Sequence, residues 1–155
     1  MEHSRVALPE PEYLVRIGEI AYTASSMEWT ILGDLHRLQS TLPANLTLAE
    51  LEPWETSRIA RKLKDEVPNV TDVGTRDYLT AVYRALFTAG EIRNDVLHAR
   101  PATTTDGSQR LNRAEMVNRL ATGHRFWIDD AWLDAAIIRL NDAIDDVEKT
   151  RPPFV

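Results

Sequence analysis

The chain has 155 residues, of which 43 % are hydrophobic and 27 % charged, and this predicts one domain over residues 1–155 with a single core. It contains no cysteine, which excludes disulfides, thiol nucleophiles and thiolate zinc sites. No apolar run is long enough to cross a bilayer and the N-terminus shows no secretory pattern, so we expect a cytoplasmic protein without a membrane segment.

The formal net charge of −6 is unevenly distributed along the chain. Between Arg93 and Arg125 there are six arginines and three carboxylates, so that stretch carries +3 and the remainder −9. A local positive patch on an acidic body is compatible with binding one phosphate group, and less so with gripping a long duplex. An ordinary solvated surface would also produce so small an excess.

The first half of the chain has the pattern of helices joined by short connections. We predict a long helix that begins at Pro11, a favoured first-turn residue, and ends before Pro43. A short connector helix is expected at 48–51. A second main helix is expected at 54–66, and Pro68 ends it.

A third main helix is predicted to take Thr75 as its N-cap and to run to about Ala99. Pro101 restricts the residue before it to extended geometry, so the helix has to end there. The segment 101–113 then resembles a small hairpin-like loop that turns at Asp106–Gly107.

After this loop we predict a short helix at 113–120 and a final long helix that opens at Asp129. All the main elements are helices, which predicts an all-α fold, an antiparallel bundle of four to five main helices. The terminal segments 1–10 and 150–155 are expected to be frayed.

Two charged residues occupy positions where the helical periodicity places apolar ones. Glu28 lies on the apolar seam of the first helix, and Arg93 lies on that of the third. A buried charge is costly unless it is paired and hydrogen-bonded, so we expect Glu28 to face Arg93 and to orient it. The alternative is a slightly rotated first helix, with Trp29 in the core and Glu28 exposed.

The end of the third helix carries the most informative segment, Glu91–His98, with the sequence EIRNDVLH. It joins a permanently charged guanidinium, an amide and a titratable imidazole. Successive helical residues turn by about 100°, which places Arg93 and His98 about 140° apart around the helix axis. They reach one phosphate only if the helix end loosens or if a second copy contributes, as in a two-fold dimer.

These three side chains suit the cleavage of RNA without a metal ion. The reaction removes the 2′-hydroxyl proton, stabilises charge on the phosphorane and protonates the leaving 5′-oxygen, which yields a 2′,3′-cyclic phosphate. His98 would transfer protons, because imidazole titrates near neutral pH. Arg93 would bind the phosphate through a bidentate contact, and Asn94 would orient the imidazole or the phosphate. An Arg and a His at a helix end are, however, more often structural than catalytic.

The order Arg93, Asn94, three further residues and His98, on the penultimate long helix of a small helical chain, resembles the HEPN superfamily (higher eukaryotes and prokaryotes nucleotide-binding). The resemblance covers this segment closely and the helical architecture loosely. It implies a homodimer whose two motif helices form one composite cleft, often with metal-independent endoribonuclease activity. Many relatives are toxins held by a protein antitoxin, or act in phage defence and stress responses. Others are non-catalytic modules that bind a nucleotide or a protein partner.

Three further residues are weaker candidates for contacts with substrate. Arg100 and Arg110 flank the hairpin-like loop and could recruit phosphate near His98, although ordinary surface positions would explain them as well. His124 lies in a basic and aromatic stretch that could stack on a base, or could simply anchor the chain before the last helix. The histidines show no metal-ligand spacing and there is no glycine-rich phosphate loop, so we expect no metal site and no cofactor.

The sequence therefore predicts a homodimeric endoribonuclease whose catalytic residues are Arg93, Asn94 and His98. The alternative is a non-catalytic HEPN-like binding or dimerisation module. A third interpretation is a structural helical bundle in which Arg93 merely pairs with Glu28. The enzyme requires His98 to be open to a cleft, whereas the structural interpretation buries both motif side chains within one chain.

Overall fold

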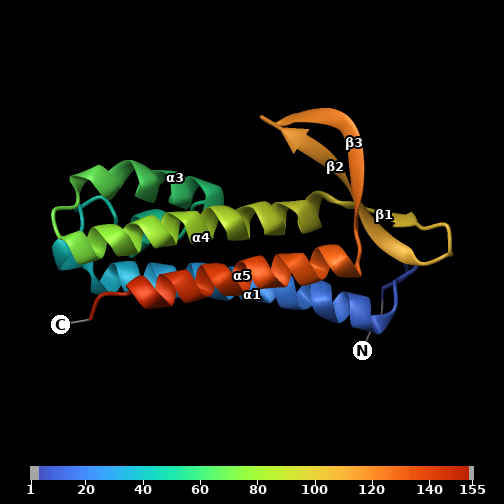
Figure 1. Ribbon diagram of the computed structural model, residues 1–155, viewed down its shortest axis with the longest axis horizontal. Coiled ribbons are helices and arrows are strands. Elements are labelled where there is room, and N and C mark those ends of the chain that lie inside the picture. Colours follow the sequence, from blue (N-terminus) through green and yellow to red (C-terminus); the bar gives the residue numbers. More distant parts are fainter. Residues whose placement is uncertain (1–3, 154–155) are drawn as a thin grey trace.

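The structure is a computed structural model that describes residues 4–153, and over this range a helical body carries a three-stranded antiparallel sheet (Figure 1). The helices are α1 (Pro11–Arg37), α2 (Leu48–Leu51), α3 (Thr56–Glu66), α4 (Val73–His98) and α5 (Asp130–Thr150), with 3₁₀ turns η1 (Gln39–Thr41) and η2 (Val67–Asn69). The strands are β1 (Arg100–Thr103), β2 (Gln109–Val117) and β3 (Leu120–Ile128). The expectation of an all-α bundle is therefore wrong, because the segment between α4 and α5 forms a sheet.

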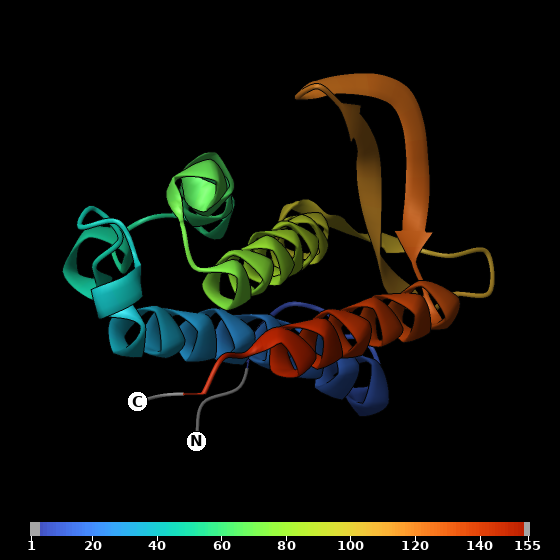
Figure 2. The same cartoon turned by 60° about the vertical axis from the view of Figure 1, so that its left-hand side comes forward.

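The three long helices α1, α4 and α5 pack against one another and enclose most of the core. Figures 1 and 2 show α1 and α5 in one layer, α4 lying across them, and α3 on the far side of α4. Helices α1, α3 and α5 all contact α4. Its fully buried side chains include Tyr78, Leu79, Leu86 and Ile92. None of the described helices combines the length and the apolar character needed to cross a bilayer.

Helix boundaries follow from local capping. Pro11 lies in the first turn of α1, as predicted, but the helix ends at Arg37, and the 3₁₀ turn η1 replaces its predicted last turn. The expected N-cap of α4 is wrong, because the carboxylate of Asp72 accepts the backbone N–H of Thr75 at 2.7 Å and the helix begins with Val73. Asp129 caps α5 by accepting the backbone N–H of Trp132 at 2.9 Å, which confirms the predicted start of that helix.

The sheet is built from two consecutive hairpins in the order β1-β2-β3. The first hairpin turns where the sequence predicted, with Gly107 at φ 88° and the Asp106 carboxylate accepting the backbone N–H of Ser108. The helix predicted at 113–120 is wrong, since these residues form the outer half of β2 and a two-residue turn into β3. Asn118 and Arg119 form that turn with φ of 50° and 66°, the left-handed conformation that tight hairpins require.

The sheet is attached to the helices through its base. The hydroxyl of Tyr13 on α1 donates to the carbonyl of Ile128 at 2.7 Å and accepts the N–H of Leu111 at 3.1 Å. Arg113 on β2 binds Asp95 on α4 at 3.1 Å. Beyond these contacts the β2–β3 hairpin leaves the helices on the same side of α4 as α3 and curves away from them (Figure 2).

One buried carboxylate joins the other end of the bundle. Asp34 on α1 is 3 % exposed and accepts hydrogen bonds from the Tyr78 hydroxyl at 2.6 Å and from Arg151 Nε at 2.8 Å. Burial, and then the hydrogen bond to Asp34, raises the pKa of Tyr78. Arg151 belongs to the segment that we expected to be frayed, and Glu10 of the other terminal segment contacts Arg110. Residues 1–3 and 154–155 of those segments lie outside the described residues.

Replacing Asp34 should therefore destabilise the fold strongly. We expect Asp34→Ala to lower the free energy of unfolding by about 3–5 kcal/mol, because it leaves the Tyr78 hydroxyl and the Arg151 guanidinium without their acceptor. Tyr78→Phe removes one hydrogen bond and keeps the ion pair, so it should cost no more than about 2 kcal/mol. Urea denaturation of the two variants measures both values, and an equal cost would contradict the assignment.

Glu66, near the C-terminal end of α3, provides a pH-dependent contact. Its carboxylate accepts hydrogen bonds from Lys62 Nζ at 2.8 Å, Asn69 Nδ2 at 2.7 Å and Asn45 Nδ2 at 2.9 Å. These donors, Lys62 first, lower the pKa of Glu66 to about 2 from an ordinary value of 4.5. The ionised carboxylate thus joins α3 to the loop that precedes α2.

The stabilisation from Glu66 should be complete above about pH 4.5 and should disappear as the pH falls toward 2, because the pKa is lower in the folded chain. We expect Glu66→Gln to melt several degrees below the wild type at pH 7, and this difference to narrow between pH 4.5 and 2. Thermal unfolding followed by circular dichroism across this range measures the difference. The same gap at pH 3 and pH 7 would contradict the prediction.

Candidate functional site

The three motif side chains line one pocket. It has a volume of about 220 Å³ and lies at the C-terminal end of α4, where the first turn of α3 approaches that helix. The residues that line it are Glu55, Thr56, Ser57, Gly90, Arg93, Asn94, Leu97 and His98. A single copy of the chain therefore brings the motif residues to one concave surface.

Gly90 allows the first turn of α3 to pass close to α4. A Cβ placed on Gly90 would lie 3.7 Å from the Cβ of Thr56 and 3.8 Å from the backbone nitrogen of Ser57, which is ordinary contact distance. A methyl group fits there, but any longer side chain would have to push α3 outward. The wall that α3 forms in the pocket thus depends on a small residue one helical turn before Arg93.

Arg93 faces a carboxylate of α1. Its Nη1 lies 4.0 Å from Glu28 Oε2, and the hydroxyl of Thr56 donates to the same oxygen. The side chains of Arg93 and Glu28 are 29 % and 20 % exposed. Trp29 is 61 % exposed, so the alternative in which Trp29 takes the core position is wrong.

The guanidinium of Arg93 keeps unused hydrogen-bond donors. The distance of 4.0 Å to Glu28 is an electrostatic contact longer than a hydrogen bond. The Nε of Arg93 is buried and has no acceptor among the described residues. The Nε has almost no accessible surface, so an anion in the pocket would reach the Nη groups, which make no hydrogen bond to a described residue, and would gain the hydrogen bonds that the protein does not supply there.

Asn94 and His98 are exposed and follow each other by one helical turn on the open side of the pocket. Helix α4 keeps its regular hydrogen bonding through His98, so the loosening of the helix end that we considered does not occur. Arg93 and His98 therefore stay about 140° apart around the helix axis, and Leu97, which also lines the pocket, lies at an angle between them. Leu97 is an apolar side chain that is 64 % exposed.

Asp95 turns away from this pocket and anchors the sheet. Its carboxylate accepts from Arg113 Nε at 3.1 Å. Burial raises the pKa of Asp95 and outweighs the opposing effect of the Arg113 guanidinium. Asp95, to which the sequence analysis gave no role, therefore joins α4 to β2.

The weaker candidates do not line the pocket. Arg100 is exposed at the start of β1, two residues after His98. Arg110 is 13 % exposed, binds Glu10 and stacks over the ring of Tyr13 at 4.5 Å, so its guanidinium has a structural role. His124 is exposed on the outer half of β3.

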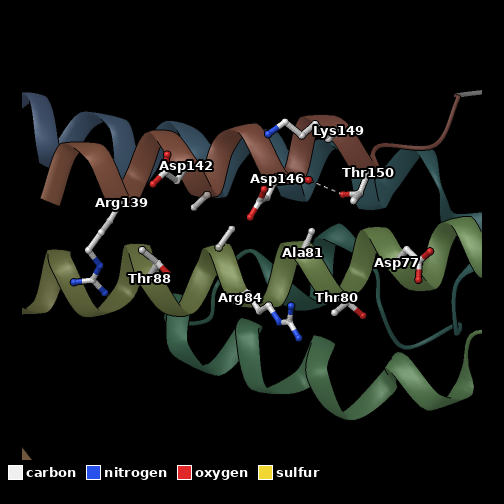
Figure 3. A pocket seen from close by; sticks show the side chains of 12 residues that line it. Asp77, Thr80, Ala81, Arg84, Thr88, Arg139, Asp142, Asp146, Lys149 and Thr150 are labelled. Carbon is white, nitrogen blue, oxygen red and sulfur yellow. Dashed lines mark hydrogen bonds between the residues drawn. The ribbon is translucent and has the colours of Figure 1, made fainter. Parts of the chain in front are cut away.

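A larger pocket of about 480 Å³ lies between α4 and α5 (Figure 3). Its floor contains small side chains such as Ala81, and its walls carry three carboxylates and three cations. Figure 3 shows Arg84 on the α4 side and Asp142, Asp146 and Lys149 on the α5 side. This balanced charge does not favour an anion, and no imidazole lines the pocket. Residues 4–153 contain no cluster of three or more acidic or histidine side chains that could hold a metal ion.

Compared with protein-family models, with curated proteins and with solved structures, the chain matches none. The resemblance to the HEPN superfamily therefore depends on the motif residues of the sequence alone. Sequence reasoning found Arg93, Asn94, His98 and Glu28 and missed Thr56 and Ser57. Nothing in the sequence indicated those two, because the contact of α3 with α4 joins residues more than thirty positions apart.

The packing at Gly90 can be tested by two substitutions of different size. Gly90→Ala should change the free energy of unfolding by less than about 1 kcal/mol, since the methyl group fits and alanine favours a helix. Gly90→Leu should cost about 1–3 kcal/mol, because it forces α3 away from α4. Chemical denaturation measures both, and equal stability of the two variants would contradict the close approach.

Proposed function

We propose that this protein is a metal-independent endoribonuclease that cleaves RNA through attack of the 2′-hydroxyl. The observation that carries the proposal is the common pocket of Arg93, Asn94 and His98, in which the guanidinium has donors without acceptors. His98 is exposed and open to the pocket, as an enzyme requires and a purely structural pair does not.

The proposed reaction uses each group for one task. The 2′-oxygen loses its proton to an imidazole and forms a bond to phosphorus, the bond from phosphorus to the 5′-oxygen breaks, and that oxygen takes up a proton. Arg93 donates to the non-bridging oxygens, on which negative charge increases in the transition state. Asn94 holds the phosphate or the imidazole, and Glu28 keeps the guanidinium in place between turnovers. The products are a 2′,3′-cyclic phosphate and a 5′-hydroxyl.

The reaction needs both a base and an acid, and one copy of the chain places one histidine in the pocket. A two-fold dimer through the C-terminal turns of α4 would supply the second imidazole. The exposure of Leu97 on the motif face supports such a contact, since 64 % of an apolar side chain would otherwise face water. We further propose that the protein acts as a toxin or as a defence or stress effector, held by a protein antitoxin.

The test is incubation of the purified protein with RNA in the presence of a chelator. We expect cleavage to 2′,3′-cyclic phosphate ends, and we expect His98→Ala to reduce the rate by about 10²–10⁴-fold because a proton-transfer group is lost. Arg93→Lys keeps the charge but loses the bidentate contact, so it should also slow cleavage, by at least about 10-fold. Gel electrophoresis of end-labelled RNA and phosphatase sensitivity of the ends identify the products.

His36→Ala is the matched control, since His36 is an exposed histidine of α1 that does not line the pocket. It should cleave RNA like the wild type. If the wild type and His98→Ala are both inert but bind a nucleotide equally in calorimetry, the protein is the non-catalytic binding module instead. Cleavage that survives in His98→Ala would refute the assigned mechanism.

A further inference from the structure

The β2–β3 hairpin, Gln109–Ile128, forms an arm that its own chain supports only at the base. Strand β1 pairs with Gln109–Asn112 alone, so beyond this point the arm is a two-stranded ribbon. Every residue from 115 to 125 is exposed. A two-stranded hairpin with both faces in water is marginally stable at best. Within residues 4–153, the distal part of the arm, residues 115–125, has neither a third strand nor a helix packed on it to stabilise it.

The tip of the arm is apolar. Val117 and Leu120 are opposite each other in the register, next to the turn, and are 55 % and 73 % exposed. Met116 is 43 % exposed but projects from the other face of the ribbon, where it lines a pocket with Phe126 and Trp132. Cross-strand partners project from the same face of a ribbon, so Val117 and Leu120 form one small apolar surface at its end. Such a surface gains more from packing on a protein than from contact with a phosphate backbone.

Charge and position indicate which protein the arm contacts. Arg110 and Arg113 at the base of the arm are already paired with Glu10 and Asp95. The distal part contains Arg119, Arg125 and Glu115, so it carries +1, and the rest of the chain carries −7. The helical body of another copy is therefore electrostatically complementary to the arm. The base of the arm is bound to α4 through Arg113 and Asp95, so whatever the distal part binds is held near the C-terminal turns of α4.

We propose that the distal part of the arm packs on the helical body of a second copy, so that two arms embrace the paired motif helices. This rests on the proposed function, in which two motif helices share one cleft. It adds a reciprocal contact, here called the clasp, in which residues 115–125 of each copy pack on the helical body of the other. Each site is then incomplete in a single chain, because the partner's arm closes one side of the cleft.

The experiment compares the double variant Val117→Asp/Leu120→Asp with the control Val6→Asp/Leu8→Asp. The control residues are also exposed apolar side chains, 69 % and 52 % exposed, but they lie in the segment before α1, outside the helices and outside the arm. Sedimentation velocity over a range of concentrations gives the dimer dissociation constant. We expect the tip variant to raise it about 100-fold or more, because charges replace the apolar contact, and the control to leave it unchanged.

Hydrogen exchange provides a second measurement. It uses the wild-type protein, so misfolding of a variant cannot affect the result. The amides of residues 115–125 should exchange slowly at concentrations where the dimer forms and quickly on dilution. A wild type that stays monomeric, or a tip variant that dimerises like the control, would overturn the clasp. A tip variant that keeps its dimer but loses RNA binding would show that the arm grips RNA, which also overturns it.

The RNA assay separates failure of the clasp from failure of the proposed function. If the wild type cleaves RNA, His98→Ala does not, and the tip variant still dimerises, the clasp is rejected and the proposed nuclease activity is supported. A tip-dependent dimer that cleaves no RNA would support the clasp and reject the nuclease.

Discussion

The buried carboxylate of Asp34 sets the arrangement on which the rest of the molecule depends. A charge that is 3 % exposed requires partners, and they come from α4 and from the residue that follows α5. This contact fixes how α1, α4 and α5 lie along one another at one end of the bundle. The hydroxyl of Tyr13 joins α1 to β2 and β3 at the other end. Helix α4 spans the distance between these two polar junctions, and its C-terminal turn, which carries the motif, lies at the end next to the sheet.

The helices were predictable because their signals are local. Pro11 at the start of α1, Asp129 before α5 and Pro101 after α4 each act through a neighbouring residue, and all three mark the boundaries that the structure has. The second hairpin had no such signal. Its turn is Asn118–Arg119 instead of an Asn-Gly pair, and Ala114, which favours a helix, lies inside β2. Pairing with β3 and the anchor at Asp95 override that local preference.

The sequence predicted which residues form the motif, but it predicted only some of the residues that surround them in the structure. Leu97 lies five whole turns after Leu79 and so has the same angle around the axis of α4, yet Leu79 is fully buried and Leu97 is 64 % exposed. In the last turns Ile92 and Val96 are buried and Arg93 is half-buried, so the periodicity of the sequence did not predict which side chains are covered there. Glu28 was placed correctly opposite Arg93 because two charges on facing seams need each other. The first turn of α3 could not be placed, since its position depends on the tertiary contact at Gly90.

Glu28 also affects which anions the pocket retains. Its carboxylate lies 4.0 Å from the guanidinium that a phosphate would bind, and it is held there by Thr56. Every incoming anion must therefore compete with a resident negative charge. Inorganic phosphate would have only its contact with Arg93 to offset the repulsion by Glu28. A long polyanion would be repelled at one phosphate and could gain further contacts with the protein through its neighbouring phosphates. Under the proposed function, the resident carboxylate would therefore favour a long polyanion such as RNA over inorganic phosphate.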